Sequence, residues 1–474
     1  MIYPIPLLRS LAALAVFSSI FHPLEAVEPT APIVIEAVGE KETAWKPRET
    51  FPLSAWPGAA EIRPDEGFTI FGGLASRRHK ATGFFRVEKS DGRWRLLDPE
   101  GCEFFQVAVS SVRPLEGHAA TDRLEEKFGS EEKWACEANA LLRANAFNST
   151  GAWSSDMLLS NCPARPVYVK IWNFMFEFGK RHAGAKMGNG HMDYPNKCVP
   201  VFHPLFEAFC EEMARELATV KDDPWLLGHY SDNELTFVRG SLVKFLELPE
   251  GDPNRVAAEE WLRKKHGDGA TAAVVTEQDE EDFLAVVVER YFRIVSAAIR
   301  KNDPNHLFLG ARFYGPDRRK NIIFRTAGPV LDVVSMNWYN TWTPQDETLD
   351  AWAGESGRPI LVTEFYAKGA DSGLGNESGA GFLVHTQRDR GLFYQNFTLA
   401  LLRNKNCIGW TWFRYADNDP KGVGEDRSNK DSNKGIVTAE YEPYTELLDL
   451  MQKVNCRVHG LAEHFDQKKP PAVK

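Results

Sequence analysis

The fold prediction rests on GHYSDNEL at residues 228–235 and on LVTEFY at residues 361–366. Each stretch is a short apolar run that ends in a glutamate, Glu234 in the first and Glu364 in the second. This pattern is typical of a buried parallel strand that carries one polar side chain at its carboxyl end. We therefore expect both glutamates at the same rim of a parallel β-structure.

Further apolar runs of strand length alternate with amphipathic segments. The candidate strands are Phe104–Val109, Ala146–Ala152, Val167–Trp172, Leu226–Tyr230, Leu307–Arg312, Val333–Trp338, Ile360–Thr363 and Cys407–Trp412. The clearest helical segments are Glu131–Arg143, Phe206–Thr219, Asp282–Lys301, Asp389–Arg403 and Tyr444–Val454. Alternation of this kind predicts an α/β fold, a (β/α)8 TIM barrel. A doubly wound sheet would need a glycine-rich phosphate-binding turn after an early strand, and the sequence has none.

The segments outside this alternation divide the chain further. Residues 1–26 are predicted as a signal peptide, because Arg9 precedes the apolar run Leu11–Phe21 and a small residue, Ala26, is available for cleavage. An uncleaved anchor is the alternative. We expect a secreted or periplasmic protein, with no transmembrane segment after signal removal.

Residues 27–100 are predicted as a linker followed by a small β-rich segment. The stretch up to Pro64 is rich in proline and glutamate, and the turn at residues 90–92 separates two short runs that predict a hairpin. The barrel is predicted over residues 101–460, with a polar tail at 461–474.

Composition excludes some partners. The net charge is −10 and no basic run is present, so nucleic acid is not expected as a partner. Seven cysteines include no C-x-x-C pair, and an odd number leaves at least one thiol unpaired. We expect most of them to be buried, and one disulfide to involve Cys162 or Cys198.

The two glutamates match the requirement of glycosidic bond cleavage for two carboxyl groups on rigid elements. Opposed positions on one rim suit the retaining geometry, in which the carboxyl groups are ~5 Å apart. In this hypothesis Glu234 is the acid/base and Glu364 is the nucleophile. Asn233 is placed to hydrogen-bond the 2-hydroxyl of the sugar.

Supporting residues are expected at the ends of other strands. Tyr339 is predicted to hydrogen-bond the nucleophile, and Trp412 to form a platform under the sugar; the alternatives are a rim aromatic and a core tryptophan. The other candidate substrate-binding residues are Trp172, Asn173, Arg312, Arg414, Asp417 and Asn418.

Several motifs also resemble a known family. Asn233-Glu234 and Thr363-Glu364-Phe365 look like the retaining glycoside hydrolases of clan A. The block at residues 407–419 and the stretch at 432–437 resemble the β-agarases of glycoside hydrolase family 50, as do residues 386–392 and 201–206. The resemblance implies a β-glycosidase with a β-linked poly- or oligosaccharide substrate of agarose type.

Other functions remain open. His182, His191 and His203 match no zinc-binding pattern, so no metal or cofactor is expected, and a histidine contact to sugar is favoured instead. A non-catalytic glycan-binding barrel is one alternative. A clan A glycosidase or transglycosylase acting on a different β-glycan is another.

Overall fold

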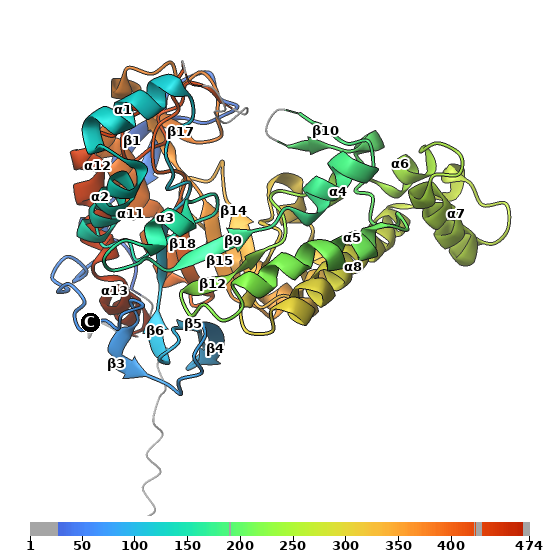
Figure 1. Cartoon of the computed structure of the whole chain (residues 1–474), viewed down its shortest axis with the longest axis horizontal. Coiled ribbons are helices and arrows are strands. Elements are labelled where there is room, and N and C mark those ends of the chain that lie inside the picture. Colours follow the sequence, from blue (N-terminus) through green and yellow to red (C-terminus); the bar gives the residue numbers. More distant parts are fainter. Residues whose placement is uncertain (1–26, 189–190, 421, 423–428, 468–474) are drawn as a thin grey trace, which may run out of the picture.

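The computed structural model describes residues 27–188, 191–420, 422 and 429–467 (Figure 1). The predicted signal peptide at residues 1–26 lies outside these ranges, as does the end of the predicted tail, residues 468–474. Within the described part of the chain, no helix is both long and apolar enough to span a bilayer.

Parallel strands form the centre of the molecule, in two separate sheets. The five-stranded sheet has the order β14 (Val334–Asn337), β15 (Ile360–Glu364), β18 (Cys407–Trp412), β7 (Gln106–Val109) and β8 (Ser149–Thr150). The three-stranded sheet has the order β13 (Leu307–Gly310), β12 (Leu226–Tyr230) and β9 (Tyr168–Ile171). The prediction of a closed (β/α)8 TIM barrel is therefore wrong, although strands occur within all eight predicted segments.

Side chains take up part of the hydrogen bonding between the edge strands of the two sheets. Between β13 and β14, the amide of Phe308 donates to the carboxylate of Asp332 (2.8 Å) and the hydroxyl of Ser335 donates to the carbonyl of Leu309 (2.7 Å). In the described ranges, the main-chain contact there consists of the isolated bridge between Phe313 and Met336 and the bond from the Asp332 amide to the Phe308 carbonyl (3.0 Å). At the other junction, a single bridge joins Ser149 of the short strand β8 to Val167. Polar side chains thus interrupt the regular ladder between β13 and β14.

Helices surround these sheets, and α6 and α7 extend at one end of the molecule, away from α12 and α13 (Figure 1). Their bounds are α1 His118–Phe128, α2 Glu131–Ala144, α3 Asp156–Ser160, α4 Phe174–His182, α5 Phe206–Met213, α6 Leu242–Leu246, α7 Pro253–His266, α8 Glu277–Asn302, α9 Asn321–Ala327, α10 Asp346–Ser356, α11 Gln387–Arg403, α12 Thr445–Asn455 and α13 Val458–Asp466. Helix α8 begins five residues before its predicted start because Thr276 and Asp279 form a capping box. Helix α13 crosses the predicted start of the polar tail and buries Leu461 and Phe465.

The segment before the parallel strands is structured, not a linker. Strand β1 (Ile33–Val38) pairs with β2 (Lys46–Thr50) and with β17 (Phe382–Val384), which pairs with β16 (Ala367–Gly369). The amide of Phe51 then donates to the side chain of Asn396 on α11 (2.8 Å). These contacts attach the start of the described chain to the loop that follows β15.

Another small sheet is antiparallel throughout and has the order β3, β6, β5 and β4. A two-stranded ribbon lies between α4 and α5 in the chain. The bounds are β3 Leu74–Arg78, β4 Arg86–Ser90, β5 Arg93–Leu97, β6 Cys102–Phe104, β10 Lys186–Met187 and β11 Met192–Asp193. The predicted hairpin is β4–β5, with Ser90 paired to Arg93.

The cysteines are mostly buried, as expected. One disulfide joins Cys136 on α2 to Cys162, which follows α3, with Cα atoms 5.1 Å apart. Cys162 is therefore one partner as predicted, whereas Cys198 is a buried free thiol.

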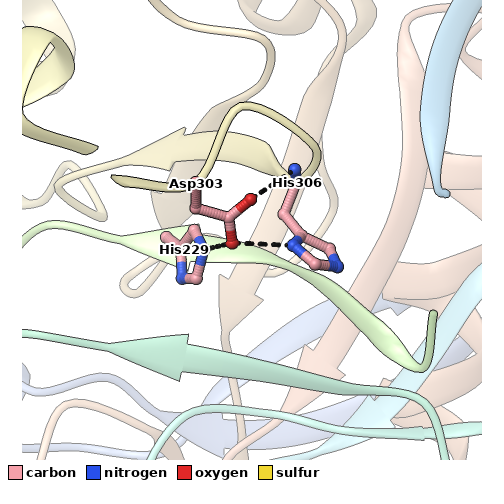
Figure 2. A group of neighbouring side chains, drawn as sticks. All are labelled: His229, Asp303 and His306. Atoms are coloured by element: carbon pink, nitrogen blue, oxygen red, sulfur yellow. Dashed lines mark hydrogen bonds and ion pairs between the residues drawn. The ribbon is translucent and has the colours of Figure 1, made fainter. Parts of the chain in front are cut away.

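A buried polar cluster ties β12 to the start of β13 (Figure 2). The carboxylate of Asp303 lies between two imidazole rings and accepts from His229 Nε2 (2.8 Å) and His306 Nδ1 (2.7 Å). The second nitrogen of His229 accepts from the indole of Trp172 (3.0 Å), and the second nitrogen of His306 donates to the carbonyl of Asp223 (2.9 Å). Every ring nitrogen is therefore engaged in a hydrogen bond.

The cluster predicts that acid destabilises the fold. Burial lowers the pKa of His229. Burial would raise the pKa of Asp303, but hydrogen bonds from His229 and His306 hold it well below its usual range. The folded state therefore resists protonation at both groups. The stability they contribute is present above about pH 6.5 and is lost as the unfolded His229, and at lower pH the unfolded Asp303, take up protons.

His229→Gln keeps a side-chain donor near Asp303 and removes the titrating ring. In urea unfolding between about pH 5 and pH 7, we expect this variant to reduce the pH slope of the unfolding free energy by up to about 1.4 kcal/mol per pH unit. His385→Gln, which changes an exposed histidine, is the matched control and should keep the wild-type slope. Equal slopes in all three proteins would contradict the prediction.

Candidate active site

A cavity of about 410 Å³ opens beside the carboxyl ends of β12 and β15. It is lined by charged and polar side chains together with aromatic rings, and both predicted catalytic glutamates are among them. The polar lining includes Glu40, Ser111, Arg113, His191, Asn233, Glu234, Glu364, Arg414 and Asn429, and the aromatic lining consists of Trp153, Tyr314, Tyr339, Tyr366 and Phe413. Glu234 and Glu364, 130 residues apart in the chain, thus meet in one cavity.

Glu364 is held at both carboxylate oxygens. Arg312 Nη2 donates to Oε1 (2.7 Å), and the hydroxyl of Tyr339 donates to Oε2 (2.6 Å). Only 4% of Glu364 is exposed, so these contacts act in a low-dielectric environment. Burial, together with the negative charge of Glu364, raises the pKa of Tyr339 far above its ordinary value, so the phenol stays a donor.

Glu234 has a different set of neighbours. Asn337 Nδ2 donates to its Oε1 (2.7 Å), and His191 Nδ1 lies 3.2 Å from its Oε2. Glu234 is 8% exposed, which leaves it access to the cavity. Burial and the charge of Glu234 also raise the pKa of the nearby Tyr314 to about 12.

A short hydrogen-bond path connects the two glutamates. The Oδ1 atom of Asn233 accepts from Arg312 Nη1 (2.9 Å) and from Asn337 Nδ2 (3.2 Å). Arg312 and Asn337 in turn donate to Glu364 and Glu234, respectively. Because its oxygen faces these donors, Asn233 has its amide nitrogen available for a ligand. The position of one carboxylate is therefore coupled to that of the other.

The chain adopts left-handed backbone conformations just beyond the strand ends around this site. Non-glycine residues with positive φ follow β7, β8, β9, β12, β13 and β14, respectively at Ser111 (53°), Trp153 (62°), Asn173 (61°), Glu234 (55°), Arg312 (51°) and Asn340 (58°). Such conformations are unfavourable for side chains with a Cβ atom and concentrate at functional sites. At these positions the backbone leaves the extended conformation, and the side chains therefore point in directions that a continued strand would not give them.

A second hollow of about 240 Å³ adjoins the first cavity at Glu234. It shares Trp153, His191, Asn233 and Glu234 with the first cavity and also has Asn173 in its lining. Glu234 therefore borders both hollows.

The structure brings together only some of the predicted substrate-binding residues. Asn233, Tyr339 and Arg414 line the cavity, and Asn173 lines the second hollow. Arg312 is fully buried and contacts the site through Glu364 and Asn233. Trp172 lines neither hollow and donates to His229.

Trp412 is not at the cavity. It is fully buried, packs against Phe365 and Tyr394, and donates to the carbonyl of Lys434 (2.9 Å). Tyr394 belongs to α11, so the side chain faces the helical layer. The next residue, Phe413, follows the end of β18 and lines the cavity.

Asp417 and Asn418 are also structural in this fold. The Asp417 carboxylate accepts from Asn433, from the amide of Gly435 and from the hydroxyl of Tyr444. Asn418 is fully buried and donates to the carbonyl of Asn429 (2.7 Å). Both residues shape the loop after β18 rather than face the cavity.

Sequence reasoning missed Glu40, Trp153 and Asn337. Glu40 comes from the turn between β1 and β2, which the sequence analysis placed in a linker. Trp153 stacks on the Arg312 guanidinium, with Cζ 4.4 Å from the ring centroid. Asn337 ends an apolar run, as the two glutamates do, and that signal was available in the sequence.

One group of side chains in the described ranges has the composition of a metal site, namely His229, Asp303 and His306. Their ligand atoms lie within 4.8 Å of one another, but each already has a hydrogen-bond partner. None of the three lines the cavity. The donor set therefore fits a structural network better than a metal centre.

Comparisons with known proteins identify relatives of this chain. No family model matches the sequence. It is 26% identical over 498 residues to β-agarase B of Vibrio sp. (strain JT0107), with 83% of this chain and 50% of that protein covered. It is 23% identical over 469 residues to β-agarase A of the same organism, covering 80% of this chain and 46% of that protein. The chain thus spans about half the length of the curated relatives that it matches.

Solved structures give the same relationship. BpGH50 superposes with a TM-score of 0.80 and 28% identity, covering 94% of this chain and 99% of that chain. An exo-β-agarase has a TM-score of 0.70 and 21% identity, over 84% of this chain and 69% of that chain, which supports the fold alone. The chain is therefore homologous to the β-agarases of glycoside hydrolase family 50.

Proposed function

We propose that the protein is a retaining β-glycosidase that hydrolyses β-linked galactans of agarose type, with Glu234 as acid/base and Glu364 as nucleophile. The observation that carries the proposal is the meeting of these two carboxyl groups in one cavity, each with its own hydrogen-bond donors. The homology to β-agarases supports the choice of substrate.

The surroundings of Glu364 suit a nucleophile. A carboxylate that attacks an anomeric carbon must be oriented and must not be free to rotate. Arg312 and Tyr339 donate to its two oxygens, and the guanidinium supplies a positive charge beside it. Attack by one oxygen would form a glycosyl ester with Glu364 and break the glycosidic bond.

The surroundings of Glu234 suit an acid that later becomes a base. It would donate its proton to the departing glycosidic oxygen, and afterwards take a proton from the water that cleaves the ester. Asn337 donates to one of its carboxylate oxygens, and the His191 ring lies beside the other. Neither of these neighbours opposes the protonated form as strongly as a fixed cation would.

The rest of the cavity suits a sugar. Sugar rings stack on aromatic faces, and Trp153, Tyr366 and Phe413 line the cavity. The amide nitrogen of Asn233 is available to donate to a sugar hydroxyl. The two adjoining hollows that Glu234 borders offer room for more than one sugar unit.

A non-catalytic glycan-binding protein is disfavoured because both carboxyl groups are present and individually supported by donors. Transglycosylation shares the covalent intermediate, and product analysis at high acceptor concentration separates it from hydrolysis. Export to the periplasm or the medium is part of the proposal and rests on the predicted signal peptide.

Glu364→Gln should abolish turnover, with a loss in kcat on the order of 10⁴-fold, because an amide cannot act as the nucleophile. Glu364→Ala should be equally inactive but less stable, since it leaves the buried donors of Arg312 and Tyr339 without any acceptor, whereas glutamine keeps one oxygen. The assay uses agarose, porphyran, carrageenan and β-galactan oligosaccharides, with products read by mass spectrometry. Glu347→Ala, in an exposed position on α10, is the control. Near wild-type activity of Glu364→Gln would exclude the assigned role.

Glu234→Gln should slow substrates with poor leaving groups far more than activated aryl glycosides, because only the former need a proton on the leaving oxygen. We expect a loss of about 10²- to 10⁴-fold in kcat on oligosaccharides. The deciding measurement is the loss in kcat on oligosaccharides divided by the loss in kcat on activated aryl glycosides. An equal loss on both would contradict the acid role.

A further inference from the structure

A third hollow, of about 600 Å³, adjoins the candidate active site. It lies between the β1–β2 turn and the segments that follow β12, β13 and β14, and it shares Glu40 and Tyr314 with the catalytic cavity. A substituent on a sugar in that cavity could therefore extend into it.

The lining of this hollow is strongly basic. It contains Lys41, Arg48, Arg239, Arg318 and Arg319. The acidic residues in the lining are Glu40 and Glu42. This excess of cations stands out in a chain with a net charge of −10.

The two carboxylates do not neutralise most of these cations. Glu42 is paired with Arg48 and Lys46, and Glu40 accepts from Asn340 Nδ2 (2.8 Å). Across the described ranges, Lys41, Arg239 and Arg319 have no ion pair with an acidic side chain. Arg239 and Arg319 are exposed.

Arg318 is fixed in place with an unused donor. Its Nη2 lies 3.4 Å from the carbonyl of Tyr339, and its Nη1 is buried without a hydrogen-bond partner. Burial lowers the pKa of Arg318, because desolvation disfavours the charged form. A buried donor without an acceptor is costly, and an anionic oxygen would satisfy it.

We propose that this hollow binds an oxyanion substituent, a sulfate ester or a carboxylate, on a sugar unit held in the adjoining cavity. The substrate is then an anionic galactan rather than a neutral one. This inference rests on the proposed function for the position of the sugar. The arginine fork suits either group, because both offer paired oxygens to guanidinium donors.

The test compares galactan oligosaccharides of one length that are neutral, sulfated or carboxylate-bearing. Binding is measured by calorimetry in the Glu364→Gln background, so that the ligand stays intact. Arg239→Gln with Arg319→Gln removes two exposed cations from the hollow. Arg263→Gln with Lys264→Gln makes the same charge change on the exposed face of α7 and is the matched control.

One anionic ligand should bind at least about tenfold more tightly than the neutral one, and the chemistry of that ligand identifies the substituent. The double variant in the hollow should remove this preference while changing the Kd for the neutral ligand by less than about twofold, and the α7 variant should keep it. Equal affinities for all three ligands, or an equal loss on all of them in the double variant, would overturn the inference.

Hydrolysis by the wild-type protein separates this inference from the proposed function. Cleavage of the neutral ligand with no anionic preference would refute only the oxyanion site. An anionic preference in binding, removed by the double variant but accompanied by no cleavage of any ligand, would support the oxyanion site and refute the glycosidase assignment.

Discussion

The site depends on one buried cation. The Arg312 guanidinium donates to the Glu364 carboxylate, to the carbonyl of Thr363 and to the side chain of Asn233. The ring of Trp153 lies 4.4 Å from its Cζ. A charge in such a place is stable only when its partners stay in position, because losing one partner leaves an unpaired buried ion. Arg312 therefore joins the end of β15 to the segment after β12, and it orients Glu364 without lining the cavity itself.

The backbone around this site adopts conformations that are energetically unfavourable for residues other than glycine. Glu234 and Arg312 both have positive φ, and neither is a glycine. Packing and hydrogen bonds must compensate such conformations. The carboxylate, amide and guanidinium groups around Asn233 provide several of these bonds. Local strain and a dense polar network thus occur together at the rim.

The start of the described chain completes the site from a distance. Strand β1 adds to the small sheet formed by β16 and β17, which follow Glu364 directly in the chain. This pairing brings Glu40 to both the catalytic cavity and the basic hollow. The β-branched run Ile33–Val38 did carry a local strand signal, which the proline and glutamate residues around it obscured. Its pairing with β17, almost 350 residues further along the chain, could not be predicted from a local pattern.

The sequence by itself determined the positions of β12 and β18, the pairing of each predicted glutamate with a strand end, and the Asn233–Glu234 motif. These features depend on local apolar patterns, which are readable without a structure. Tertiary structure alone decided that the strands form two sheets instead of a closed barrel, because Asp332 and Ser335 take main-chain partners at the junction. It also decided that Trp412 faces α11 while Trp153 faces the cavity. Such choices depend on contacts between residues far apart in the chain, and a local pattern carries no information about which distant groups will satisfy one another.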